Sequence, residues 1–307
     1  MIYLGRIGLM AMVAIAFGLM LNGPASATGV TGFRLGGRPA QDVFTNPQTA
    51  SLAKATCTGS VSKINALVKN GADVNGRGEK GITPLIWAMN CHSLEGVLAL
   101  LKAGANPNQA TRIGAGPNQS NSDGVTAVYL AAGRHDARTL SILLKYGGNP
   151  NAVYNPNYFN KYSALMNAVG LDRVQNMKLL LTYGANVNLH DGEGSAPGHG
   201  FSVLVYAGHR FDMVLYMLQH AQFTRDNLQQ YADYYLSGSL PNGFIRPPTI
   251  RDIKADRWLA LYAKIISYFK NNNIFPHNKG APPPRDLANI TLNQYKIFWR
   301  ENIHSSP

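Results

Sequence analysis

One phrase of twelve residues occurs four times along the chain. Each copy joins an apolar stretch with helical spacing to a glycine, and then to a short polar turn that ends in asparagine. The copies occupy residues 64–75, 97–108, 140–151 and 177–188, and their glycines are 33, 43 and 37 residues apart. Because one such unit cannot bury its apolar face alone, the repetition predicts a stack of helical repeats. A stack of this kind offers a long binding surface rather than a catalytic cleft.

A second helix start precedes each phrase. The clearest one contains Thr83, which can cap a helix, followed by Pro84 at the first helical position, where its missing N–H costs nothing. In the third copy Ala127 replaces the proline, and Ser163 is the expected cap of the fourth copy. Together with the glycine turns, these segments resemble the ankyrin repeat, whose pattern opens with Thr-Pro-Leu-His. In the clearest copy Ile86 replaces the histidine.

The resemblance covers roughly residues 48–221 and implies an all-α ankyrin-repeat solenoid of about five helix pairs. A degenerate first pair begins near Leu52, and a weaker fifth pair begins near Phe201. The family recognises other proteins through its concave helix face and its hairpin tips. The resemblance therefore implies a protein partner and favours a non-enzymatic role.

Residues 222–307 do not follow the repeat pattern. Two segments, 225–236 and 251–270, have apolar residues at helical spacing, and 287–299 is a third helix candidate. Since a solenoid needs terminal caps, we expect a C-terminal helical extension that shields the last repeat. The alternative is a second partner-binding element.

The start of the chain has the organisation of a secretory signal. Arg6 precedes an uncharged apolar run over residues 7–21, and Ala25-Ser26-Ala27 forms a cleavage site of small residues. The run is shorter than the ~20 residues that a membrane-spanning helix needs. We expect residues 1–27 to be a signal peptide, residues 28–47 to be a partly ordered leader, and the mature protein to be periplasmic in a bacterium. An uncleaved membrane anchor is the alternative.

The composition is that of a folded, basic protein. Of 307 residues, 45% are hydrophobic and only 14% are charged, which argues against a disordered chain, and the net charge is +12. The basic residues are dispersed, and export argues against nucleic acid as the partner. We therefore expect an acidic protein partner, a toxin or a periplasmic enzyme, no stable membrane anchor after cleavage, and a monomer when the protein is free.

Cys57 and Cys91 are the two cysteines of the chain. Export favours a disulfide between them. However, equivalent positions of stacked helices lie ~8–10 Å apart, and a disulfide needs Cα atoms within ~7 Å. From the sequence, a disulfide and two small buried thiols both remain open.

The sequence contains no nucleophile elbow, phosphate-binding loop or paired-cysteine zinc pattern. His190, Asp191, His199 and His209 form the one group of potential metal ligands, and their spacing is that of solvated loops. We predict no catalytic residue, no metal and no cofactor.

The candidate partner-binding residues lie in expected hairpin tips and on exposed edges of first helices. Two insertions, 109–123 and 152–161, lengthen neighbouring tips, where solenoids often bind their partners. Arginine and aromatic side chains are common at binding hot spots. The candidates are Arg77, Glu79, Lys80, Arg112, Arg134, Asn157, Tyr158, Phe159, Tyr162 and Arg210.

Three functions are compatible with these features. The first is a periplasmic module that binds and neutralises a partner, such as an immunity protein that guards its producer against a toxin delivered to the periplasm. The second is a stabilising companion of a periplasmic enzyme, for example one used in oxidative defence. The third, an enzyme with its site in residues 222–307, is the least favoured because that region contains no catalytic motif.

Overall fold

The structure is a computed structural model that describes residues 38–111, 124–157, 160–191, 200–208, 210–235 and 255–274. The expected signal peptide and the helix candidate 287–299 lie outside these ranges. The chain divides into two compact units, Met1–Asn186 with Asp191–His199, and Val187–His190 with Gly200–Pro307. The domain boundary that the sequence suggested at residue 221 falls inside the second unit, because the fifth helix pair groups with the helices that follow it.

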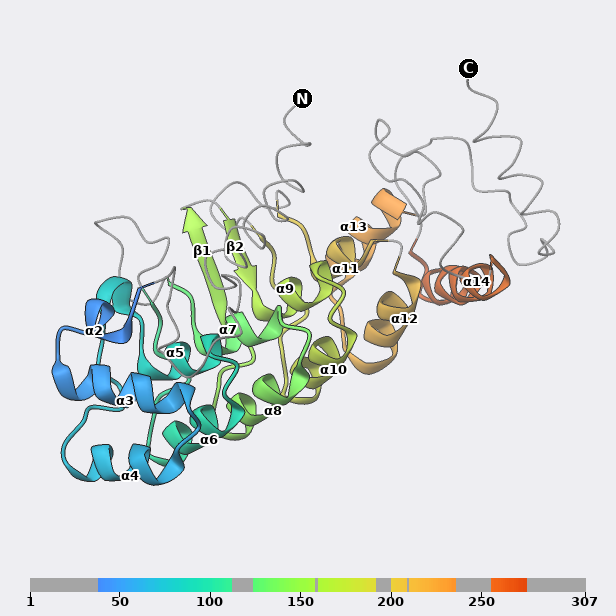
Figure 1. The fold of residues 1–307 in the computed structure, drawn as a ribbon. Coiled ribbons are helices and arrows are strands. Elements are labelled where there is room, and N and C mark those ends of the chain that lie inside the picture. The colour runs from blue at the N-terminus through green and yellow to red at the C-terminus, as the bar shows by residue number, and fades with distance from the viewer. Residues whose placement is uncertain are drawn as a thin grey trace, which may run out of the picture. The chain divides into compact units, whose positions relative to one another are not determined.

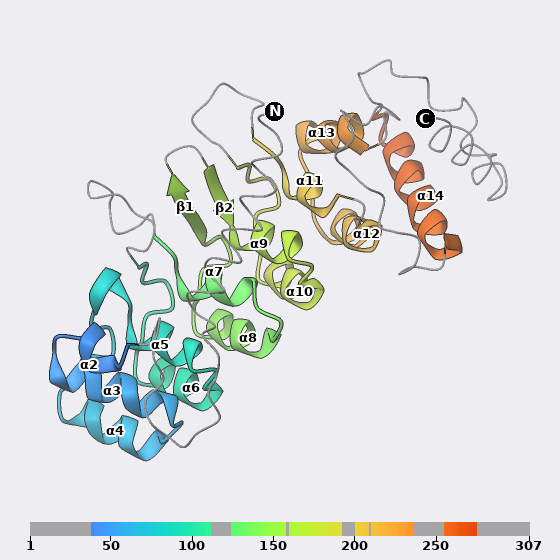
Figure 2. The same cartoon turned by 45° about the horizontal axis from the view of Figure 1, so that its top comes forward.

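The first unit is built from four helix pairs in two rows (Figure 1). The first helices are α3 (Pro47–Cys57), α5 (Pro84–Asn90), α7 (Ala127–Ala132) and α9 (Ala164–Gly170). The second helices are α4 (Val61–Lys69), α6 (Leu94–Lys102), α8 (Ala137–Lys145) and α10 (Val174–Thr182). Figure 2 shows the two rows from a second direction, with each first helix beside its second helix. Since each helix also contacts its counterpart in the next repeat, the apolar faces are buried between repeats.

The helix boundaries follow from local chemistry that the sequence displays. The hydroxyl oxygen of Thr83 accepts a hydrogen bond from the backbone N–H of Ile86 at 3.2 Å, so that it caps α5 as predicted. Thr126 and Ser163 cap α7 and α9 in the same way. Each second helix ends at a glycine with a positive φ between 81° and 90°, a conformation that costs other residues free energy; these glycines are Gly71, Gly104, Gly147 and Gly184.

The asparagine that ends each phrase links its repeat to the next one. Asn75 donates through Nδ2 to the carbonyl of Gly104 at 3.1 Å, and its Oδ1 accepts from the backbone N–H of Asn106 at 2.7 Å. Asn108 makes the same two bonds one repeat later, to Gly147 and Asn149. We call this set of bonds the asparagine ladder. It holds the turns of successive repeats in register.

The expected leader is partly built into the fold. Residues Ala40–Val43 form the short helix α2, and Phe44, which is 1% exposed, packs edge-on against Trp87 with ring centroids 5.7 Å apart. Trp87 is itself fully buried. The segment before α3 therefore packs against the first helices α3 and α5.

The insertion at residues 152–161 forms a β-hairpin, an addition to the all-α arrangement that the repeat implied. Strand β1 (Val153–Asn157) pairs with β2 (Asn160–Ser163) in antiparallel register, with Tyr154 opposite Tyr162. Both tyrosines are buried, and the ring of Tyr154 lies 5.4 Å from that of Tyr129 on α7. Burial, and then the proximity of these two tyrosines, raises the pKa of Tyr129. The base of the hairpin is thus part of the core.

Cys57 and Cys91 form a disulfide with a Cα–Cα distance of 5.1 Å. The expected separation of 8–10 Å is wrong because it applies to residues that face each other along packed helices. Cys57 is the last residue of α3, and Cys91 is the residue that follows α5. At these helix ends the backbones approach more closely than the helix axes do.

The second unit contains the fifth helix pair and two further helices. In sequence order they are α11 (Val203–Ala207), α12 (Phe211–His220), α13 (Arg225–Tyr235) and α14 (Ala255–Asn271). The hydroxyl of Tyr231 on α13 donates to the carbonyl of Gly208 at 3.1 Å, and its ring stacks on Phe269 of α14. Phe211 of α12 stacks on Tyr262 of α14. Within the described ranges, every helix is too short or too polar to span a membrane.

Candidate protein-binding surface

Three of the predicted recognition residues lie together before α5. Arg77 is exposed, and its Nη1 donates to the carbonyl of Ala110 in the next repeat at 2.8 Å. Glu79 and Lys80 belong to a short 3-10 turn, Glu79–Gly81, and Glu79 is paired with Arg38. Lys80 is exposed at a φ of 54°, in the left-handed region that non-glycine residues seldom adopt. This turn presents a mixed-charge tip to solvent.

The predicted residues of the two insertions have different placements. Arg112, Tyr158 and Phe159 lie outside the described residues. Asn157 is the last residue of β1 and pairs with Asn160 across the hairpin. Tyr162 is only 7% exposed, and its ring belongs to the tyrosine core under the hairpin. Tyr162 therefore lies in the core, where it helps to hold the hairpin against α7, and not on the surface of the hairpin.

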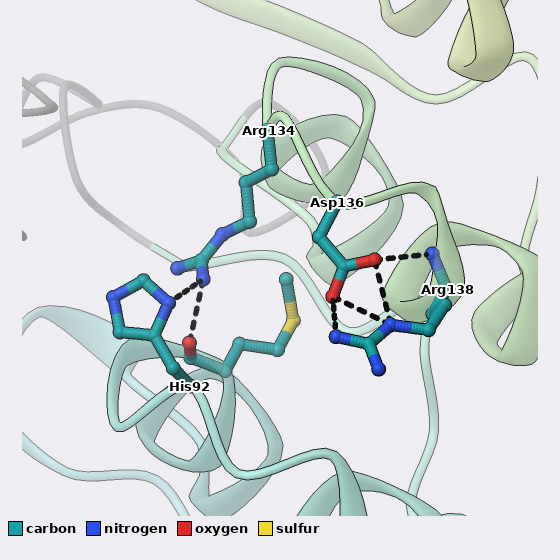
Figure 3. A network of polar contacts seen from close by, with 5 residues as sticks. His92, Arg134, Asp136 and Arg138 are labelled. Atoms are coloured by element: carbon teal, nitrogen blue, oxygen red, sulfur yellow. Dashed lines mark hydrogen bonds and ion pairs between the residues drawn. The ribbon is translucent and has the colours of Figure 1, made fainter.

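Arg134 lies in the turn between the first helix α7 and the second helix α8 of one repeat (Figure 3). Its Nη1 donates to the carbonyl of Met89, at the end of α5, at 2.7 Å, and lies 3.4 Å from Nδ1 of His92. Asp136, two residues later, points the other way and accepts from Nε and Nη2 of Arg138 at 2.9–3.1 Å. Asp136 also caps α8 by accepting the backbone N–H of Arg138. We call these four side chains, His92, Arg134, Asp136 and Arg138, the turn cluster.

Burial and charge shift the titration of the turn cluster. The pKa of Arg134 is lowered because burial disfavours its charged form, and the charge of Asp136 opposes this in part. The pKa of His92 is lowered by burial and by the positive charge of Arg134. The pKa of Asp136 is lowered mainly by its hydrogen bonds from Arg138. The pair of Asp136 and Arg138 is therefore matched, whereas Arg134 is a desolvated cation without a carboxylate bonded to it.

Side chains of the next repeat also bind backbone carbonyls at the end of a first helix, here α7. Arg173 donates through Nε to the carbonyl of Gly133 at 2.9 Å, and Asn176 donates to the carbonyls of Ala132 and Arg134. Asn167 on α9 donates to the carbonyl of Tyr129 at 3.0 Å. These contacts explain why polar residues are tolerated at positions of the repeat that are otherwise apolar.

Arg210 belongs to the second unit and is paired within its own turn. Its Nε and Nη2 donate to the two carboxylate oxygens of Asp212, each at 3.1 Å. This pairing lowers the pKa of Asp212 against the opposing effect of burial. The predicted recognition residues are thus distributed over several separate places: the turn before α5, the hairpin, the turn cluster and the second unit.

The sequence reasoning missed exposed residues at the ends of the second helices. Tyr183, after α10, and Val61 are the exposed large hydrophobic residues among those described, at 41% and 45%. Tyr183 directly precedes the glycine of its phrase, and this position is a signal that was visible in the sequence. The last turns of α4, α6 and α8 each present an exposed lysine: Lys69, Lys102 and Lys145.

The row of second helices in the first unit has a marked excess of positive charge. Glu95 is the one carboxylate within α4, α6, α8 and α10, against six lysine and arginine residues. Lysine at a helix C-terminus is favourable in itself, because it complements the helix dipole. The same row of charges gives this face an attraction for an acidic surface. In the described part of the chain, no group of three histidine, cysteine or acidic residues is placed to hold a metal ion.

Comparison with known protein families identifies the repeats. Residues 80–112 match the family model of the ankyrin repeat, and residues 112–191 match a model described as ankyrin repeats in three copies. A search among curated proteins gave no match. The helix pairs, their threonine and serine caps and their glycine turns agree with these matches. The chain therefore contains ankyrin repeats, which form a mostly helical solenoid of the kind that binds other proteins.

Proposed function

We propose that this protein is an exported protein-binding module that occludes one partner and thereby neutralises it. The observation that carries the proposal is the disulfide between Cys57 and Cys91 inside an ankyrin stack. Structural disulfides persist in oxidising compartments and are rare in the cytosol. The expected signal peptide at residues 1–27 points to the same compartment.

The partner we propose is an acidic protein, and the role is that of an immunity protein in the bacterial periplasm. A net charge of +12 and the basic row of second helices favour a negatively charged partner. Complementary charge raises the rate of association more than it raises affinity. Rapid capture suits a protein that must intercept a toxin before the toxin acts.

The compartment is tested by producing the full chain in a Gram-negative bacterium and fractionating the cells. We expect the protein in the periplasmic fraction, with an intact mass that corresponds to cleavage after Ala27 and to one disulfide. A chain that keeps Met1 and carries two free thiols in the cytosol would contradict the export proposal.

The role is tested with the protein that the mature chain captures from periplasmic extract. If the proposal is right, a stoichiometric titration with the mature chain abolishes the toxicity or enzymatic activity of the captured protein. The competing role, a companion of a periplasmic enzyme, predicts undiminished activity and slower inactivation of that enzyme on heating. Failure to retain any protein specifically would contradict both roles.

A further inference from the structure

Arg134 has a hydrogen-bonding edge that the fold does not use. Its Nη1 is held by the carbonyl of Met89 and lies beside His92. Its other two nitrogens, Nε and Nη2, have no hydrogen-bond partner among the described residues, and they are not buried out of reach of solvent. The guanidinium is therefore fixed at one corner, while the edge that can bind a carboxylate with two parallel bonds stays open.

Three other arginines of the protein show what can occupy this edge. Arg138 places Nε and Nη2 on the carboxylate of Asp136, and Arg210 places the same two nitrogens on Asp212. Arg173 uses Nε for the carbonyl of Gly133. The turns of this protein thus repeatedly pair the side-on edge of an arginine with an oxygen, and the equivalent edge of Arg134 lacks one in the described structure.

A carboxylate bound to Arg134 should stabilise a complex more than a carboxylate bound to an exposed arginine, because of the environment of Arg134. Arg77 has a similar arrangement, with Nη1 on the carbonyl of Ala110, but it is exposed, so water already solvates its charge. Arg134 is partly buried, and burial lowers its pKa. Asp136 supplies some compensating field, yet its two oxygens are bonded to Arg138. A partly desolvated cation gains most when an opposite charge completes its hydrogen bonds.

We propose that the Nε–Nη2 edge of Arg134 receives the side-chain carboxylate of an aspartate or glutamate on the bound partner protein. This inference rests on the proposed protein-binding function and names one contact within it. The contact lies at the turns between first and second helices, whereas the family resemblance directs attention to the concave face and the hairpin tips. An acidic partner is also what the net charge of +12 favours.

A first test uses a peptide and does not require the natural partner. The Nε–Hε resonance of Arg134 is assigned by its loss in Arg134→Lys and is followed by NMR during titration with acetyl-Ala-Glu-Ala-amide. We expect it to shift saturably, and we expect the Nε–Hε resonance of Arg173 to stay in place because Gly133 already occupies it. Equal shifts with acetyl-Ala-Gln-Ala-amide would overturn the proposal. A stronger response to acetyl-Ala-Ala-Ala with a free C-terminus would overturn the assignment to a side-chain carboxylate.

A second test uses the protein captured from periplasmic extract. Arg134→Lys keeps the positive charge and a donor for Met89 but loses the two-nitrogen edge, so binding should weaken about tenfold. Arg173→Lys is the matched control and should bind within about twofold of the wild type. Equal affinities of the two variants, with wild-type melting, would overturn the inference while leaving the protein-binding role intact. If Arg134→Lys does not fold, the resonance is assigned in the wild-type protein by through-bond NMR experiments, and the peptide titration decides this inference. The same titration decides it if no partner is captured.

Discussion

Cys57 and Cys91 are covalently joined, and their disulfide links the end of α3 to the end of α5. The first helices of two successive repeats are therefore tied together at one end of the stack. The terminal repeat of a solenoid has a neighbour on one side only, so it is the part that separates most readily. The disulfide restrains this separation.

Removing the disulfide should lower the stability of the first unit. The cysteines are 34 residues apart, and closing a loop of this length stabilises a fold by up to about 4 kcal/mol through the unfolded chain. Urea unfolding of Cys57→Ala/Cys91→Ala should show a lower midpoint than the wild type. Dithiothreitol should lower the wild-type midpoint to a similar value and leave that of the double variant unchanged; an insensitive wild type would show that the linkage contributes nothing.

Breaking one step of the asparagine ladder should cost more than its exposed position suggests. Asn108→Ala removes the bonds to the carbonyl of Gly147 and to the backbone N–H of Asn149, two backbone groups of the next repeat. We expect a loss of about 1–2 kcal/mol in the free energy of unfolding. Asn65→Ala on α4 is the control, since Asn65 is exposed and has no hydrogen-bond partner among the described residues. Equal effects of the two substitutions would argue against the ladder.

The pair of Asp136 and Arg138 should make stability depend on pH in acid. The pKa of Asp136 is lowered in the folded state, so the ionised carboxylate stabilises the fold above about pH 4. This contribution disappears as the pH falls through the lowered pKa. Asp136→Asn keeps a residue that caps helices and removes the charge.

The side chain of Asp136 is 44% exposed, so solvent screens the pair and the effect should be small. We expect Asp136→Asn to lose a few tenths of a kcal/mol at neutral pH and to match the wild type near about pH 2. Denaturant unfolding at the two pH values measures this. A deficit that persists unchanged in acid would mean that the cap or local packing, and not the ion pair, is responsible.

Tyr231 should be essential for the second unit. Its side chain is fully buried, stacks on Phe269 and donates to the carbonyl of Gly208. Tyr231→Ala should cost about 3–5 kcal/mol by leaving a large cavity, and Tyr231→Phe about 1 kcal/mol by leaving the carbonyl unpaired. Tyr183→Phe, at an exposed site, should leave the thermal unfolding curve unchanged. A folded Tyr231→Ala with wild-type melting would contradict the packing of α13 against α11 and α14.

The features that the sequence predicted well depend on residues close together in the chain. Thr83 caps the helix that follows it by accepting the backbone N–H of a residue three positions along the chain, and Gly104 follows the end of a helix. The four glycines and the caps of the first helices were therefore sufficient to predict the repeat, and the repeat in turn predicted the helix pairs. The resemblance to ankyrin repeats rested on the same local signals.

The features that the sequence did not predict depend on contacts between repeats. The bond from Arg134 to the carbonyl of Met89 spans 45 residues and has no local signature. Tyr162 was expected among the partner-binding residues, yet it is only 7% exposed and lies opposite Tyr154 in the hairpin. The disulfide distance was misjudged because the ends of two helices approach more closely than their axes.

The asparagine ladder has a consequence for how binding specificity can change. The bond from Asn75 to Gly104 joins two phrases whose glycines are 33 residues apart. The bond from Asn108 to Gly147 joins the same two groups in phrases whose glycines are 43 residues apart. In the sequence, the extra residues lie between each ladder asparagine and the next helix cap. The length of an insertion can therefore change while the ladder bonds between successive repeats stay the same. The segments 109–123 and 152–161 can accordingly differ in length at a constant repeat pitch, and a new partner is best selected by changing their residues other than Ala110, Thr111 and Tyr154, which are buried in the scaffold.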